Sequence, residues 1–376
     1  MSGIQKDNEE VKTFVRRFAR EKIEPHVYDT DRAGTPSAEL IDLFRTSGLF
    51  GLIVPRKYGG AEAPFADLLT ALEEIAAVCS GSASVLSVHT AALLSLIDFS
   101  GTSEKKIPDS NFLTGEKLLG YSFSGADSVT DDPSDRLSYT ASGETYTLSG
   151  TVPRVLNGSI CDAAVVAAYK EPEALDSPGN VFIIEKGTPR MTFGADEETL
   201  GLRALSIAPA FFDDCTVPGS AVVGSEGQAS GIISRAESYA RLMAAVLSVG
   251  VMRCAFDNAY TYGMQREQFG KKIGTFQALE NMMVDMQVAL NAGKGMIDRA
   301  LSSFENKPED LKKLAAQAKL FCADAAMKTA TDAVQIHGGY GYMRDFPVEK
   351  LMRDAKMLQL LFGAPHHLKT LLAALL

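Results

Sequence analysis

The sequence predicts a mostly helical α+β protein in which a central β domain separates two helical regions. Three observations support this fold class: helical periodicity in the first third, short β-type runs after Leu118, and long helical stretches after Gln228. The expected domains are a helical domain (1–118), an antiparallel β domain (119–225) and a C-terminal bundle (226–376). A chain of 376 residues with 46% hydrophobic residues is also too long for one compact core.

Apolar residues at helical spacing run through the N-terminal third. The first helix begins near Asn8 and is expected to end at Pro25, because proline interrupts a helix interior. Two strongly apolar runs, residues 65–81 and 82–101, predict two helices that pack on each other. His89 lies in the second run and is expected to be a core residue, since that is the commoner role on an apolar helix.

The pattern changes to β-type between Leu119 and Gly224. Runs rich in β-branched and aromatic residues are separated by Gly, Pro, Ser and Asp, which is typical of antiparallel strands joined by turns. The clearest runs are residues 146–157, 163–170, 180–186, 189–194 and 208–218.

Helical periodicity returns near Gln228 and continues to the end of the chain. Residues 235–270 could form one very long helix, residues 276–305 a second, and residues 308–339 a third. Long helices in succession with short joints predict a four-helix bundle.

Charge and cysteine usage argue against several classes of protein. A net charge of −10 leaves no basic field for general nucleic-acid binding. The five cysteines are scattered without a CxxC motif, so a metal site is not expected and the thiols fit a reducing compartment. The N-terminus has no apolar signal core, and no apolar run is expected to span a membrane, so a soluble, cytoplasmic protein is expected.

Two glycine-containing motifs lie among the C-terminal helices. Arg266 beside a Gly turn suits a diphosphate, and Phe269 and Phe276 could face a flat ring. A surface arginine with two core phenylalanines is the plainer interpretation of each residue alone. Gly338 and Gly339 would let a backbone approach a ligand closely, although they also suit an ordinary helix connection.

Taken together and in order, the motifs resemble those of the acyl-CoA dehydrogenase family. RxQFG followed by FQ, then QxxGGxGY, then PxExxxRDAK, occur at residues 266–270, 276–277, 335–342 and 347–356. The resemblance covers almost the whole chain. It implies an FAD flavoprotein oxidoreductase that acts on an acyl-CoA or acyl-carrier thioester, with FAD between the β domain and the bundle. It also implies a homo- or hetero-tetramer or dimer, whose neighbouring subunit completes the adenosine end of the site, and an electron-transfer flavoprotein as a candidate partner.

The resemblance assigns site residues position by position. It places Arg266 at the FAD diphosphate, Phe269 near the adenine and ribose, and Arg241 beside the CoA channel. The implied FAD-binding residues are Ser122, Ser128, Arg266, Phe269, Phe276, Gln277, Gln335, Gly338 and Gly339.

Both positions that carry the catalytic base in the family lack a carboxylate here. The glutamate position after RDAK is Phe362, and the alternative position, immediately before Arg241, is Ala240. Neither side chain can accept a proton, so no catalytic residue is assigned. Glu237 lies one turn before Ala240 and could face the same cavity, but a solvated carboxylate near the helix start is the more ordinary interpretation.

The residues expected around the flavin differ from the family pattern as well. Arg154 stands where the family has a tryptophan, and Leu156 replaces a hydroxyl residue. Three interpretations stay open: a dehydrogenase with a relocated base, a catalytically silent subunit that supports FAD binding in a heteromer, or a member with other acyl-CoA or flavin chemistry. A CoA-binding or scaffold protein without flavin is a fourth class, which would leave Arg266 and the glycine loop without a purpose.

Overall fold

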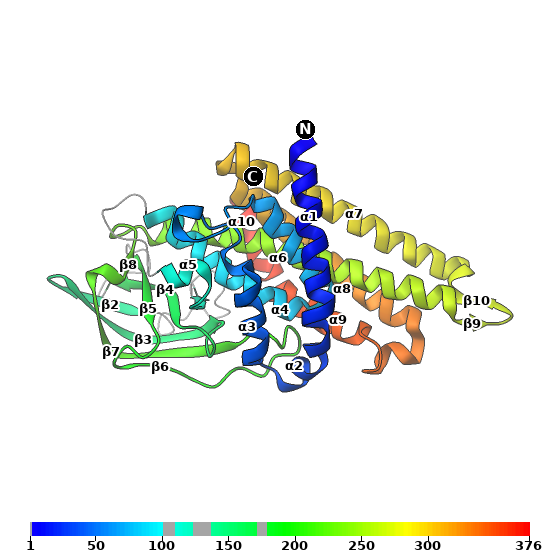
Figure 1. Ribbon diagram of the computed structural model, residues 1–376, viewed down its shortest axis with the longest axis horizontal. Coiled ribbons are helices and arrows are strands. Elements are labelled where there is room, and N and C mark those ends of the chain that lie inside the picture. The colour runs from blue at the N-terminus through cyan, green and yellow to red at the C-terminus, as the bar shows by residue number, and fades with distance from the viewer. Residues whose placement is uncertain (1, 101–109, 123–136, 171–178) are drawn as a thin grey trace.

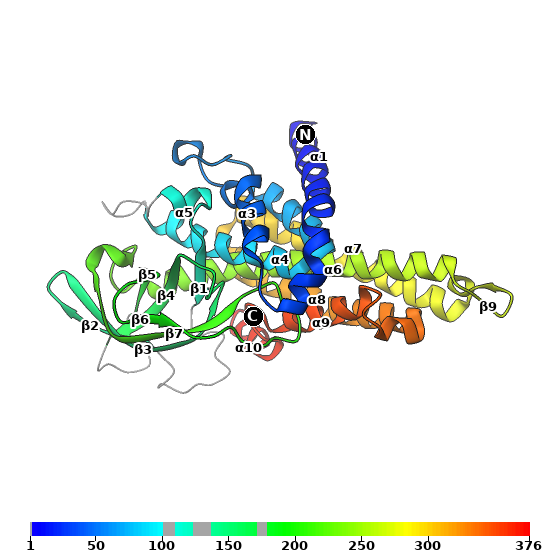
Figure 2. The same cartoon turned by 60° about the horizontal axis from the view of Figure 1, so that its bottom comes forward.

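The computed structural model describes residues 2–100, 110–122, 137–170 and 179–376. Within them, a β-sheet lies at one end of the molecule and long helices extend to the other (Figures 1 and 2). The N-terminal helices lie across the middle, against the long helices of the C-terminal region. This arrangement confirms the predicted fold class.

The N-terminal region is helical as the sequence predicts, but its first helix ends differently from the prediction. The helices are α1 (Ser2–Phe18), α2 (Val27–Ala33), α3 (Ala38–Ser47), α4 (Phe65–Ser100) and α5 (Ser110–Thr114). Pro25 does not stop the chain from coiling, because a π-helical turn (Ala19–Ile23) and a 3-10 turn (Glu24–His26) lead directly into α2. Proline is tolerated there because it occupies the first turn of a new helical segment.

The two predicted apolar helices follow each other within α4. The chain bends at Cys79, which has non-helical angles of φ −150° and ψ 101°. His89 is completely buried, and its Nδ1 accepts a hydrogen bond from the backbone N–H of Leu119 at 3.1 Å. Burial lowers the pKa of His89 to about 3, so the ring is neutral and acts as a core residue.

Eight strands form one sheet in the described residues. They are β1 (Leu119–Ser122), β2 (Ser138–Ser142), β3 (Thr145–Leu156), β4 (Ala163–Lys170), β5 (Gly179–Glu185), β6 (Met191–Phe193), β7 (Ile207–Pro218) and β8 (Val222–Val223). The order is β6-β7-β3-β1-β4-β5-β8, and β2 pairs with β3 and β4. Pairing is antiparallel except that β4 runs parallel to β1 and β2.

Strand β4 shows why one stretch of this sheet is apolar without alternation. Ala163, Val165 and Ala167 belong to the core shared with the helices. The alternate residues Ala164, Val166 and Ala168 belong to a second core between the strands. Since both faces are covered, neither face selects polar side chains.

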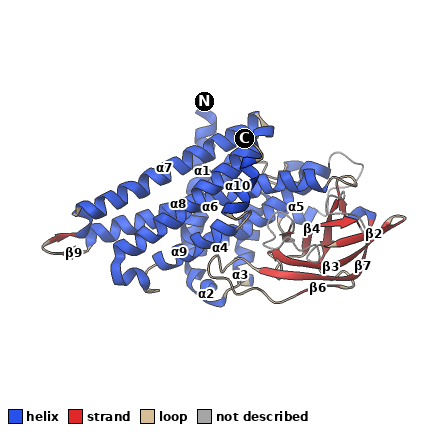
Figure 3. Cartoon of the chain, turned by 180° about the vertical axis from the view of Figure 1, so that it is seen from behind, coloured by secondary structure: helices blue, strands red, loops and turns tan. Residues whose placement is uncertain are grey.

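The C-terminal region consists of α6 (Ala229–Gln265), α7 (Gln277–Asn306), α8 (Leu311–His337), α9 (Val348–Leu360) and α10 (Pro365–Ala373). A short hairpin, β9 (Glu267–Gln268) with β10 (Lys271–Lys272), joins α6 to α7 at the end farthest from the sheet (Figure 3). Helices α4 and α6 approach closely at Gly250, where an added Cβ would lie 2.6 Å from the Cβ of Ala76.

Helices α4 and α6 also meet the length and composition of a membrane span, over Phe65–Phe99 and Ala229–Gln265. The expectation that no apolar run is long enough was therefore wrong. The most apolar windows of these helices are 89% and 83% buried inside the protein, and the core helices of soluble proteins have the same composition.

A buried carboxylate joins α9 to the rest of the molecule. Asp354 is fully buried and accepts hydrogen bonds from Ser80 Oγ at 2.7 Å, from the Leu202 backbone N–H at 2.7 Å, and from Lys350 Nζ at 2.6 Å. Ser80 follows the bend of α4, and Leu202 lies between β6 and β7. The Asp of the RDAK motif therefore has a structural role.

A second buried carboxylate joins α4 to α1 and α6. Glu74 is 4% exposed and accepts hydrogen bonds from Arg16 at 2.9 Å and from Arg253 at 2.8 Å. Burial alone would raise the pKa of Glu74, but the hydrogen bonds from the two arginines outweigh it and lower the pKa to about 2.

Candidate functional site

A buried ion pair on α6, formed by Arg241 and Glu237, is the centre of a site inside the protein, which we call the interior site. Arg241 Nη2 donates to Glu237 Oε2 at 2.8 Å, and the two side chains are 1% and 9% exposed. Their spacing of four residues places both on one face of the helix. Glu237 is therefore not the solvated carboxylate that the sequence favoured. The arginine four residues later is the feature of the sequence that could have indicated a buried ion pair.

Arg241 also holds the turn that follows α9. Its Nε donates to the backbone oxygen of Phe362 at 3.2 Å. Phe362 has a φ of 56°, which is a strained conformation for a bulky residue and typical of functional sites. From the other side, the fully buried Lys319 of α8 donates to the backbone oxygens of Gln359, at 2.8 Å, and Gly363. The turn that carries position 362 is thus fixed by two buried cations.

The interior site reaches the sheet through Phe362. Its ring is buried and packs edge-on against Tyr121 of β1, with 6.1 Å between ring centroids. Ser122, which follows Tyr121, is 8% exposed. Of the predicted site residues, Arg241 therefore belongs to this interior region and Ser122 borders it along β1, whereas Ser128 lies outside the described residues.

The loop after β3 is anchored to the same region by Asn157. Its Nδ2 donates to the backbone oxygens of Val85, at 3.1 Å, and Leu119, at 3.2 Å. Asn157 has a φ of 59° and is completely buried. Leu156 before it is half-buried, and Arg154 is exposed. The two departures from the family pattern thus border a firmly held turn.

A second site, which we call the distal groove, lies at the C-terminal end of α6. Arg266, Gln268, Gly338 and Gly339 line a groove with a volume of about 420 Å³. A Cβ added at either glycine would meet nothing within 4 Å, so the backbone is open toward the groove. An open glycine backbone beside a guanidinium group fits the diphosphate of a dinucleotide.

The other predicted residues of this end lie outside the groove. Phe269 is 93% exposed and contacts the ring of Phe276 at 6.3 Å, so the interpretation of these residues as core phenylalanines is wrong for Phe269. Gln277 begins α7 and Gln335 lies in the last turn of α8, and both are exposed. The structure places these four residues at the same end of the molecule but does not gather them around one pocket.

The interior site and the distal groove are too far apart to bind one cofactor within a single chain. Arg241 lies in α6 and Arg266 caps its end, about 25 residues later, which corresponds to about 37 Å. Figure 3 shows the sheet and the β9–β10 hairpin at opposite ends of the helices. Both sites can serve the same extended dinucleotide only if two chains contribute.

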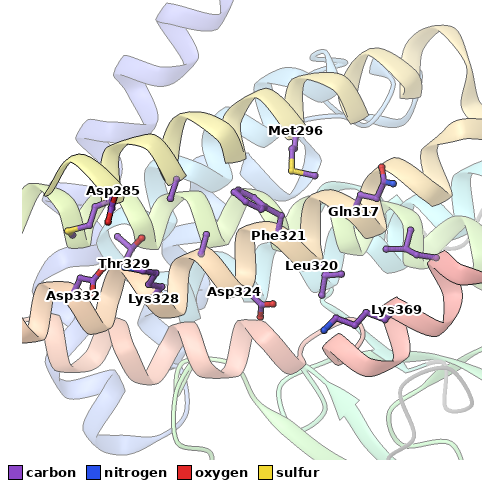
Figure 4. Close-up of a pocket in the computed structure, with 14 residues that line it drawn as sticks. Asp285, Met296, Gln317, Leu320, Phe321, Asp324, Lys328, Thr329, Asp332 and Lys369 are labelled. Carbon is purple, nitrogen blue, oxygen red and sulfur yellow. Dashed lines mark hydrogen bonds and ion pairs between the residues drawn. The ribbon is translucent and has the colours of Figure 1, made fainter. Parts of the chain in front are cut away.

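A larger groove, of about 770 Å³, lies between α7, α8 and α10 (Figure 4). Its lining is largely apolar, with Asp285, Asp324, Asp332, Lys328 and Lys369 also contributing. Phe321 projects into it and is 37% exposed. The described residues hold no group of three or more His, Cys, Asp or Glu side chains that could bind a metal ion.

Comparison with known proteins agrees with this geometry. Sequence profiles of the acyl-CoA dehydrogenase N-terminal and C-terminal domains match residues 5–107 and 231–375. A short-chain-specific acyl-CoA dehydrogenase of Clostridium acetobutylicum is 32% identical over 96% of this chain and 95% of the relative. The structure of butyryl-CoA dehydrogenase from Megasphaera elsdenii aligns with a TM-score of 0.90 at 28% identity, over 100% of this chain and 98% of that one. An FAD-dependent dehydrogenase aligns with a TM-score of 0.86 at 25% identity, over 98% and 97%.

Proposed function

Because the chain belongs to the acyl-CoA dehydrogenase family, we propose that it oxidises the Cα–Cβ bond of an acyl thioester, with FAD as the electron acceptor. The observation that best supports this proposal is the geometry of the interior site. A strained turn at position 362 is held by Arg241 and packs against β1, although the residue in the turn is Phe362. Strain of this kind persists where the surrounding structure enforces it, and it supports retention of an active-site turn.

The chain offers two places that would hold FAD. The guanidinium of Arg266 and the open backbone at Gly338 and Gly339 fit the diphosphate. The region beside Ser122 and Tyr121, between the sheet and α6, would receive the flavin ring. When bound, FAD supplies the two-electron acceptor for the reaction.

The same geometry supports an assembly of several chains. The distal groove of one chain would complete the site that begins at Ser122 in another, because one chain cannot bring both together. The apolar groove between α7, α8 and α10 would then contact a further copy in a tetramer. Its aspartates and lysines can pair across such an interface, since a two-fold contact presents the same patch twice.

The visible absorption spectrum of the purified protein tests the proposal, followed by anaerobic titration with acyl-CoA thioesters of increasing length and with acyl-carrier thioesters. We expect a flavin spectrum that bleaches with at least one thioester. Flavin that no thioester reduces would contradict oxidation of the Cα–Cβ bond.

A second candidate is a catalytically silent subunit that supports FAD binding by an active homologue. It is favoured by the contrast between the distal groove, which keeps Arg266, Gly338 and Gly339, and the missing carboxylate at positions 240 and 362. A protein that is colourless alone and acquires FAD only when expressed with an active homologue would support this candidate.

A further inference from the structure

We propose that Glu237 is the base that removes the α-proton of the thioester, in place of a carboxylate at position 362. This inference rests on the proposed function and adds a residue to it. It starts from the single guanidinium group of Arg241, which bonds both the Glu237 carboxylate, at 2.8 Å, and the Phe362 backbone oxygen, at 3.2 Å. Glu237 is therefore joined, through Arg241, to the turn from which the family's base would act.

The position of Glu237 on α6 supports the same placement. Ala240 occupies the alternative base position of the family, and Glu237 precedes it by three residues. Residues three and four apart lie on one face of a helix, so residues 237, 240 and 241 share a face. All three are buried. A carboxylate three residues upstream can reach toward the same reacting carbon with its longer side chain.

Burial of this ion pair is costly unless the charges serve a purpose. Removing two charges from water costs several kcal/mol each, and well-packed apolar side chains would commonly serve stability equally well. The pair also leaves one polar group unused. Arg241 Nη1 is buried and has no hydrogen-bond partner within the part of the chain that the structure describes. An unused buried donor beside a carboxylate supports the placement of a ligand acceptor atom here.

Other acidic and basic groups near this part of α6 are less suited to the role. Tyr239 OH donates to Asp98 Oδ2 at 2.5 Å, and burial together with this carboxylate raises the pKa of Tyr239. Asp98 is also paired with Arg235 at 3.2 Å. His366 lies beyond the turn and is exposed. Glu237 is the carboxylate that contacts Arg241.

With FAD as the electron acceptor, every proton and electron pair of the proposed step is accounted for. The Cα–H bond breaks and its proton bonds to a carboxylate oxygen of Glu237. The electron pair of that bond forms the Cα=Cβ double bond, and the β-hydrogen leaves with its own electron pair to oxidised FAD. Glu237 becomes neutral while Arg241 keeps its charge and its bond to the turn, which holds the site in place during the transfer.

Exchange of the α-proton isolates the base from the rest of the reaction. The holoenzyme is reduced with dithionite, so that oxidation cannot proceed, and is incubated in D2O with the acyl-CoA that bleaches it best. Deuterium in the recovered thioester is measured by mass spectrometry. We expect E237Q to slow the exchange about 100-fold or more, because general-base catalysis contributes about 10²–10⁴-fold. E237Q keeps the side-chain volume and an acceptor for Arg241, and the FAD content and thermal midpoint of the variant verify its folding.

Two further variants make the test specific. D257N removes an exposed carboxylate from the same helix and should leave exchange unchanged. In the E237Q background, F362E should restore exchange, because it returns a carboxylate to the turn that Arg241 holds. Equal exchange by E237Q and the unmodified protein, with flavin bleaching intact, overturns the role of Glu237 and leaves the proposed function standing. A protein that neither bleaches nor exchanges with any thioester overturns both.

Discussion

Replacing Asp354 with alanine should destabilise the protein strongly, although this residue lies outside both candidate sites. The substitution removes the carboxylate that accepts hydrogen bonds from Ser80, from the Leu202 backbone N–H and from the charged Lys350. Breaking a buried ion pair from one side costs about 3–5 kcal/mol, because the remaining charge stays buried. The Lys350 side chain is 13% exposed. Burial alone would lower the pKa of Lys350, but the charge of Asp354 outweighs this effect and raises the pKa. We therefore expect the free energy of unfolding to fall by about 4 kcal/mol.

The measurement is urea unfolding followed by circular dichroism at one fixed protein concentration, because self-association shifts the apparent stability. Asp42→Ala is the matched control, since Asp42 is 66% exposed and forms an exposed ion pair with Arg45, three residues later. Exposed pairs contribute about 0.2–1 kcal/mol, so the control should remain near the unmodified protein. Asp354→Asn separates charge from volume, because the amide oxygen can still accept from Leu202. A loss for Asp354→Ala no larger than for Asp42→Ala would refute the role of this carboxylate.

Three other variants test separate features. Glu74→Gln should lose about 3 kcal/mol of stability at pH 7. This contribution is present above pH 4.5 and disappears as the pH falls toward 2, because the folded pKa of Glu74 is depressed; a pH-independent difference in urea midpoint would contradict it. Arg266→Ala should bind FAD about 10-fold or more weakly, as measured by FAD retention in ultrafiltration. Arg56→Ala is the control, because the Arg56 side chain is 80% exposed. Full FAD occupancy in Arg266→Ala would count against the distal groove. Phe321→Asp should lower the mass measured by light scattering, whereas Phe14→Asp, at an exposed position of α1, should not. An unchanged mass for both variants would remove the groove from the interface.

The order of helical, β and helical regions followed from local patterns in the sequence. Periodicity and turn residues act over a few positions, so the run 163–170 was identified with the bounds that β4 has in the structure. In the structure, Arg266, Gly338 and Gly339, which belong to the family motifs, line one groove. The same motifs did not show which residues serve structure, and the Asp of RDAK proved to join three parts of the fold.

What the sequence alone determined is the fold class, the family and the absence of a carboxylate at positions 240 and 362. Only the tertiary structure decided that Glu237 is buried and tied through Arg241 to Phe362, a residue more than 100 positions later in the chain. It also decided that the interior site and the distal groove lie far apart along α6. The physical reason is that secondary structure depends on near neighbours, whereas burial and ion pairing depend on which distant segments pack together.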